Sequence, residues 1–200
     1  PILEESGLII PVGKWIIQNA FSMCTECRKY YPEFRVSINL SYVQILKSPL
    51  MMELKQIIDH SGISCSGIIV ELTESGYLEG TPAVRSVWND MKKLRIQIAL
   101  DDFGTGYSNL MNISNLEPDI VKLDRGFTLK ALSRSYEYQL MQYVIEMVHK
   151  LNQYVCVEGV ETKEDLEKIK ALGPDLIQGY YYSKPCSRDE FLKKFFGYSE

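Results

Sequence analysis

Two adjacent carboxylates, Asp101 and Asp102, stand directly after an apolar stretch, Ile96–Leu100, whose residue types suit a buried strand. A turn containing Gly104 and Gly106 follows them. Carboxylates at the end of a buried strand are costly to desolvate unless a positive charge meets them, and a divalent metal ion would supply that charge. Asp-Asp-x-Gly is also ordinary turn chemistry. This stretch therefore predicts either a metal site or a pair of solvated turn residues.

Polar residues also stand at the ends of the other predicted strands. Together with the two aspartates they come from six different strands and are mostly carboxylates and amides, namely Asn39, Glu71, Lys122, Glu158 and Gln178. Any one of them could be a boundary residue, since strands commonly end in something polar. In a barrel of parallel strands, however, the carboxyl ends converge on one face, which is where the active sites of such barrels lie. We therefore interpret the set as one site.

This inventory of side chains suits chemistry at phosphorus. Several carboxylates and an Asn carbonyl can hold two divalent metals about 3.5–4 Å apart, and such a pair stabilises the attacking and leaving oxygens of an in-line displacement. Lys122 is the one lysine of the set, and it is suited to contact the attacking water or a phosphate oxygen. The alternative for Lys122 is an ion pair with Asp124.

The sequence argues against several other chemistries. The two histidines, His60 and His149, lie in helix-like segments, which disfavours both histidine-ligated zinc and a serine–histidine nucleophile. The segment from Gly104 to Gly106 lacks the third glycine of a dinucleotide fingerprint. A metal held by the carboxylates should therefore be a hard ion with oxygen ligands, Mg²⁺ or Mn²⁺ before Zn²⁺.

The composition is that of a soluble globular chain of one domain, with 200 residues, of which 46% are hydrophobic and 24% charged. The net charge of −4 offers no basic field to a nucleic-acid polymer or to anionic lipid. No apolar run reaches the ~20 residues of a membrane span, so we expect no membrane segment in this chain. Five cysteines without framework spacing indicate a reducing cytoplasm, and Cys24-x-x-Cys27 lacks the second pair of a zinc site.

Hydrophobic periodicity predicts six strands separated by helices. The strands are expected at Phe34–Leu40, Gly67–Leu72, Ile96–Leu100, Asp119–Leu123, Tyr154–Val157 and Leu176–Gln178. The helices are expected at Pro11–Tyr30, Pro49–His60, Pro82–Leu94, Ser108–Asn115, Tyr136–Leu151, Lys163–Leu172 and Arg188–Phe196. This alternation is typical of a parallel α/β sheet, either a doubly wound open sheet or a (β/α)8 barrel of which six strands are visible. We interpret the tyrosine clusters at 30–31, 136/138 and 180–182 as core.

Six motifs carry a resemblance to one known family, and they run in the family's order along almost the whole chain. They are I-N-L-S at 38–41, E-L-T-E at 71–74, D-D-F-G-T-G-Y-S at 101–108, V-K-L-D-R-G-F at 121–127, V-E-G-V-E-T at 157–162 and Q-G-Y-Y-Y-S-K-P at 178–185. With these motifs the chain resembles the EAL domain, the cyclic di-GMP phosphodiesterase module of bacterial second-messenger signalling.

The resemblance implies a (β/α)8 TIM-like barrel of the EAL type, which uses two Mg²⁺ or Mn²⁺ ions to hydrolyse cyclic di-GMP to linear pGpG. The metal ligands that it implies, with Asp101 bridging, are Asn39, Glu71, Asp101, Asp102 and Glu158. It implies catalytic roles for Lys122, Glu158 and Glu161, and positions in or beside the substrate pocket for Gln178 and Asp124. Glu74 would anchor the loop Phe103–Asn109, which the family links to dimerisation and to metal occupancy.

The Glu-Ala-Leu motif that names the family lies upstream of the position that corresponds to Pro1, and this chain does not contain it. We therefore expect residues 1–200 to be a single, N-terminally incomplete EAL domain. The alternative to an enzyme is a catalytically inactive EAL domain that acts as a cyclic di-GMP receptor or as a protein-interaction module. Every motif present keeps its acid, amide or lysine, which favours the enzyme. The family further implies a homodimer and, in a longer protein, sensory or GGDEF domains.

Overall fold

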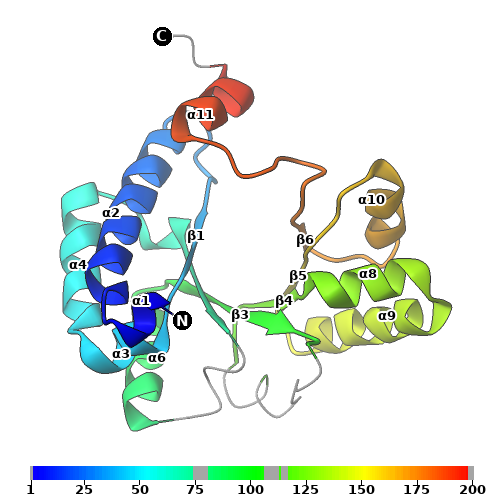
Figure 1. The fold of residues 1–200 in the computed structure, drawn as a ribbon, viewed down its shortest axis with the longest axis horizontal. Coiled ribbons are helices and arrows are strands. Elements are labelled where there is room, and N and C mark those ends of the chain that lie inside the picture. The colour runs from blue at the N-terminus through cyan, green and yellow to red at the C-terminus, as the bar shows by residue number, and fades with distance from the viewer. Residues whose placement is uncertain (1, 74–80, 106–112, 114–116, 198–200) are drawn as a thin grey trace. The chain divides into compact units, whose positions relative to one another are not determined.

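The computed structural model describes residues 2–73, 81–105, 113 and 117–197, and the chain forms two compact units. The first unit comprises Pro1–Leu72, Gly76–Ile98 and Ser187–Glu200. The second comprises Thr73–Ser75 and Ala99–Cys186. Figure 1 shows the fold and labels its helices and most of its strands.

The first unit contains a pair of parallel strands and most of the helices. Its elements in chain order are α1 (Ile2–Glu5), α2 (Ile9–Cys27), β1 (Val36–Asn39), α3 (Tyr42–Lys47), α4 (Leu50–Ser61), the 3₁₀ turn η1 (Cys65–Gly67), β2 (Ile68–Thr73), α6 (Pro82–Lys93) and α11 (Arg188–Phe196). Helix α2 lies beside α4 and against β1 (Figure 1). Strands β1 and β2 are in parallel register, with Asn39 opposite Glu71.

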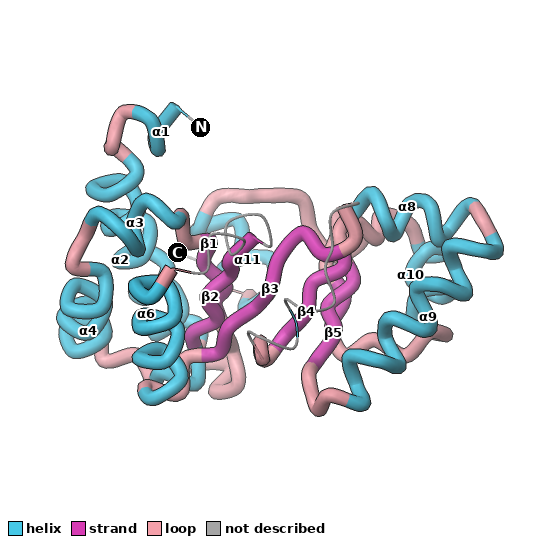
Figure 2. The backbone as a smooth tube through the Cα atoms, turned by 90° about the horizontal axis from the view of Figure 1, so that it is seen from below, coloured by secondary structure: helices cyan, strands magenta, loops and turns pink. Residues whose placement is uncertain are grey.

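The second unit carries the other parallel strands. Its elements are β3 (Gln97–Phe103), whose first two residues belong to the first unit, then β4 (Ile120–Leu123), α8 (Arg125–Ser133), α9 (Ser135–Lys150), β5 (Tyr154–Val157), α10 (Lys163–Lys170) and β6 (Leu176–Ile177). Strand β4 pairs with both β3 and β5, and β5 also pairs with β6, always in parallel. Figure 2 shows β4 and β5 side by side, and α9 lies against both α8 and β5.

Each unit has its own hydrophobic core. In the first unit, Phe21 of α2, Leu54 of α4 and Met91 of α6 are fully buried together with Ile68 of β2. In the second unit, the fully buried side chains include Leu123, Met141, Ile145 and Val155, which lie on β4, α9 and β5. Burial of such apolar surface is the main favourable term in folding, and here it fixes the strands whose carboxyl ends carry the polar residues.

The predicted alternation of strands and helices is confirmed, and some bounds match the sequence prediction. Strand Tyr154–Val157 and helix Arg188–Phe196 have the predicted bounds, and Ser187 caps that helix as its residue type suggests. Helices α1, α3 and α8 were not predicted. Most of the predicted helix at Ser108–Asn115 lies outside the described residues.

The structure tests one expectation about side chains and shows the state of two cysteines. The tyrosine clusters were predicted to be core, and this is wrong for Tyr30, Tyr31, Tyr136 and Tyr180–Tyr182, which are all at least 40% exposed. Cys24 and Cys27 are buried free thiols. None of the helices in the described part of the chain combines the length and the apolar character that a membrane crossing needs.

Candidate functional site

The second unit brings three of the predicted site residues into direct contact. The Nζ atom of Lys122 on β4 lies 2.9 Å from Oδ1 of Asp101 on β3 and 2.7 Å from Oε1 of Glu158, which follows β5. All three side chains are at most 16% exposed. We call these residues the Lys122 cluster. Since charged groups so far from water need partners, the pairs account for the presence of a lysine in the middle of a buried strand.

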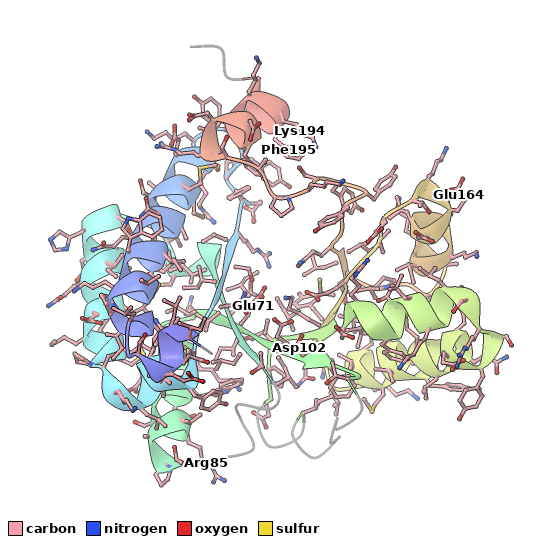
Figure 3. All side chains as sticks on the ribbon, in the orientation of Figure 1. Glu71, Arg85, Asp102, Glu164, Lys194 and Phe195 are labelled. Atoms are coloured by element: carbon pink, nitrogen blue, oxygen red, sulfur yellow. The ribbon has the colours of Figure 1, made fainter. Side chains whose placement is uncertain are left out.

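A bulge in β3 places both aspartates beside this lysine. Leu100 pairs with Val121 and Phe103 pairs with Leu123, so two residues of β3 stand opposite the single residue Lys122 of β4. Asp102, the extra residue, has a φ of 61°, and its N–H donates to Oδ1 of Asp101 at 3.0 Å. The sequence predicted that the strand ends at Leu100, but the structure extends it through both aspartates to Phe103. Figure 3 shows the side chain of Asp102 on this strand.

The side chains at these strand ends have donor atoms of the kind that a hard divalent cation takes, although they are not arranged around a metal position. Asp101, Asp102 and Glu158 carry three carboxylates against the one ammonium of Lys122, so the group has a net negative charge inside the protein. Carboxylate oxygens are the ligands that Mg²⁺ and Mn²⁺ prefer. Among the described residues, no group of three or more His, Cys, Asp and Glu side chains is arranged to hold a metal ion. Within the cluster, the ammonium of Lys122 lies between the two acids.

The chain segment that carries Glu158 is fixed by backbone hydrogen bonds. The N–H of Glu158 donates to the carbonyl of Leu123 at 3.1 Å, which continues the ladder between β4 and β5. The N–H of Gln178 donates to Val157 at 2.8 Å, and the N–H of Val160 donates back to Gln178 at 3.2 Å. Gln178, predicted to line the substrate pocket, is therefore bonded through its main chain to both sides of Glu158.

An ion pair holds the outer part of the same segment. Nη2 of Arg125, the first residue of α8, lies 2.6 Å from Oε1 of Glu161. Gly159, which lies between Glu158 and Glu161 in the sequence, has a φ of +80°, a conformation that favours glycine. Glu161 was predicted to be catalytic, and the structure places it at the surface in this pair. Arg125 was missed because nothing in the sequence shows which acid it meets.

Asp124 is the N-cap residue of helix α8. Its Oδ1 accepts the N–H of Gly126 at 2.7 Å, which caps the helix, and its own N–H donates to Phe103 at 3.0 Å. The alternative considered for Lys122 was an ion pair with this residue. The structure instead pairs Lys122 with Asp101 and Glu158.

In the first unit, Asn39 and Glu71 are neighbours on the paired strands β1 and β2. Glu71 is buried at 6% exposure, and Figure 3 shows its side chain on β2. The hydroxyl of Ser37 donates to Oε1 of Glu71. Ser37 stands two residues before Asn39 and therefore shares its face of the strand. Sequence reasoning missed Ser37, although its position in the period-2 pattern was a signal.

The last predicted site residue, the loop anchor Glu74, lies outside the described residues. The loop that it was expected to hold is described only as far as Thr105.

Comparisons with known proteins show which proteins this chain resembles. A sequence profile of the family described as "EAL domain" matches residues 1–185. The "Cyclic di-GMP phosphodiesterase PdeF" of Escherichia coli (strain K12) is 31% identical over 92% of this chain and 25% of its own length. The curated relatives that were matched are long, and the chain spans about a quarter of their length.

Solved structures share the fold. The structure described as "EAL Enzyme Bd1971 - cAMP and cyclic-di-GMP bound form" matches with a TM-score of 0.90 and 29% identity, over 96% of this chain and 54% of that one. "PaMucR Phosphodiesterase, c-di-GMP complex" matches with a TM-score of 0.88 and 26% identity, over 96% and 78% of the two chains. The predicted fold class, an α/β fold of the EAL barrel type, is confirmed, and six strands lie within the described residues.

Proposed function

The chain belongs to the EAL domain family, and from this premise we propose that it hydrolyses cyclic di-GMP to linear pGpG. The observation that carries the proposal is the Lys122 cluster, in which an ammonium group and two carboxylates from three separate chain segments meet at 2.7–2.9 Å. Such a group can position a water molecule and accept its proton. The relatives described as cyclic di-GMP phosphodiesterases support the choice of substrate.

In the proposed reaction a water oxygen attacks one phosphorus of the cyclic dinucleotide. A new P–O bond forms, one P–O bond of the ring breaks, and the product is a linear dinucleotide with a terminal phosphate. Lys122 donates a hydrogen bond to the water and orients its lone pair toward phosphorus. The carboxylate of Glu158, 2.7 Å from that ammonium, takes the proton that the water loses. The leaving oxygen takes a proton from the solvent and becomes a hydroxyl.

The metal ions that we propose are Mg²⁺ or Mn²⁺. Their ligands would be Asn39, Glu71, Asp101, Asp102 and Glu158. When bound, such ions lower the pKa of the water and stabilise charge on the attacking and leaving oxygens. Gln178, Asp124 and Glu161 would line the substrate site, and Glu74 would anchor the loop that follows Phe103. The homodimer and the sensory or GGDEF partners of a longer protein also remain predictions.

Turnover tests the proposal directly. Purified protein is incubated with cyclic di-GMP and Mg²⁺ or Mn²⁺, and the formation of pGpG is followed by chromatography. With the metal ion present, Lys122→Ala and Glu158→Ala should each abolish turnover and leave the fold and much of the nucleotide binding. Glu164→Ala is the matched control, since this acid lies on α10 outside the cluster (Figure 3). Binding without pGpG formation would establish the receptor alternative, and turnover retained in both variants would refute the assigned roles.

A further inference from the structure

Lys122 carries the one positive charge within the Lys122 cluster. Its side chain is 6% exposed and meets one oxygen of Asp101 and one of Glu158. One carboxylate lies on β3 and the other directly follows β5, and these two strands pair with β4 on either side. Removal of the ammonium would leave the buried Asp101 and the half-buried Glu158 without this counter-charge. A buried charge whose partner is removed is strongly destabilising.

A divalent metal would interact with the same two acids. Like charges repel, and at a few ångströms in a protein interior the repulsion between an ammonium and a metal ion is large compared with thermal energy. The ammonium must therefore weaken metal binding at these carboxylates. At the same time it supplies part of the counter-charge that the carboxylates need.

We propose that Lys122 sets the metal affinity of this site and keeps the folded protein stable independently of the metal. The proposal rests on the metal-binding part of the proposed function and is independent of the nucleotide. It gives Lys122 a second task beside the orientation of water. If Lys122 only oriented water, its removal would change neither the metal affinity nor the dependence of stability on metal.

The test compares the wild type with Lys122→Met, a side chain of similar length without charge. Mn²⁺ alone is the probe, with no nucleotide present. Calorimetric titration gives the Mn²⁺ dissociation constant, and thermal unfolding is measured in EDTA and in Mn²⁺. Lys130→Met is the matched control, because Lys130 is exposed on α8.

Lys122→Met should bind Mn²⁺ about tenfold more tightly than the wild type, since the repulsion is gone. Its Tm in EDTA should fall by about 10 °C, and Mn²⁺ should restore most of the loss. Mn²⁺ should raise the Tm of the wild type and of Lys130→Met much less.

A triple variant keeps the test decisive if Lys122→Met does not fold in EDTA. Asp101→Asn, Lys122→Met and Glu158→Gln together remove the three charges, and the triple variant should have a Tm in EDTA above that of Lys122→Met alone. An Mn²⁺ affinity that is unchanged or weaker in Lys122→Met, or a triple variant no more stable than the single one, would overturn the proposal. Absence of Mn²⁺ binding in all the proteins would overturn it as well. Failure to hydrolyse cyclic di-GMP would count against the proposed function only.

Discussion

A Cβ atom on Gly159 would lie 2.4 Å from Cγ of Arg125, closer than real side-chain contacts come. Cβ and Cα of Arg125 would be the next atoms that it meets, at 2.9 and 3.1 Å. The turn that follows β5 can therefore lie against the start of α8 only because residue 159 has no side chain. Glu158 immediately precedes this contact, so the contact fixes the position of the proposed proton acceptor.

Gly159→Ala should lower turnover more than tenfold, because displacement of a reacting group by about 1 Å can cost ~100-fold in rate. The left-handed backbone adds about 1–2 kcal/mol of strain. Gly173→Ala separates these effects, since Gly173 has a similar φ of +75° and nothing within 4 Å of its Cβ position. It should lose a similar amount of stability from strain and keep its kcat. Equal kcat values for the two variants would contradict the prediction. Steady-state kinetics and thermal unfolding give both quantities.

Ser37→Ala should raise the Mn²⁺ concentration needed for half-maximal turnover. The hydroxyl of Ser37 donates to the buried carboxylate of Glu71, a proposed metal ligand, and holds it in place. A hydrogen bond to a charged group contributes about 1.5–3 kcal/mol, so a modest loss of stability should accompany the change. Ser64→Ala, which removes an exposed hydroxyl, is the control. An unchanged metal requirement in Ser37→Ala would show that Glu71 does not depend on this bond.

The buried cysteines should resist alkylation. Burial raises the pKa of the Cys27 thiol from 9.0 to about 11, and burial likewise raises the pKa of Cys24. With iodoacetamide at pH 8, the exposed Cys186 should react first, whereas Cys24 and Cys27 should react only after unfolding in urea. Mass spectrometry of the peptides locates the label. Rapid labelling of Cys27 in the folded protein would contradict the burial described here.

The raised pKa of Cys27 also has a consequence for stability. The unfolded chain ionises this thiol near pH 9, whereas the folded protein keeps it neutral until about pH 11. The contribution of the neutral Cys27 thiol to the free energy of unfolding is therefore fully present below pH 9 and is lost as the pH rises toward 11. Cys27→Ala should show a shallower fall of Tm across this window than the wild type.

Much of the fold could be predicted because the local signals agree with the final packing. Tyr154–Val157 is a short β-branched run with clear bounds, and both ends match. Helix α3 was missed although Ser41 and Gln44 form a capping box, because the segment is only six residues long. Asp124 likewise caps α8, but its acidic side chain was assigned to the site and not to a helix start.

The candidate site was harder to predict where it depends on strand register. The residue types at the strand ends identified Asp101, Lys122 and Glu158, which the structure brings together. Ser37 and Arg125 were missed. They contact Glu71 and Glu161, which are distant from them in the sequence, and these contacts exist only once the chain has folded. The exposed tyrosines were wrongly assigned to the core because aromatic rings are often buried. Tyrosine also carries a polar hydroxyl group, which suits it to the protein surface.

The bulge in β3 separates the pairing of the strand from the chemistry proposed for its aspartates. Deletion of the single codon for Asp102 would leave Asp101 opposite Lys122 and Phe103 opposite Leu123, so the strand pair would become regular. The apolar residues on either side would keep their faces, and one carboxylate would be gone. One mutational event could therefore remove a residue of the proposed site and keep the strand pairing, with no damage to the core that later mutations would have to repair.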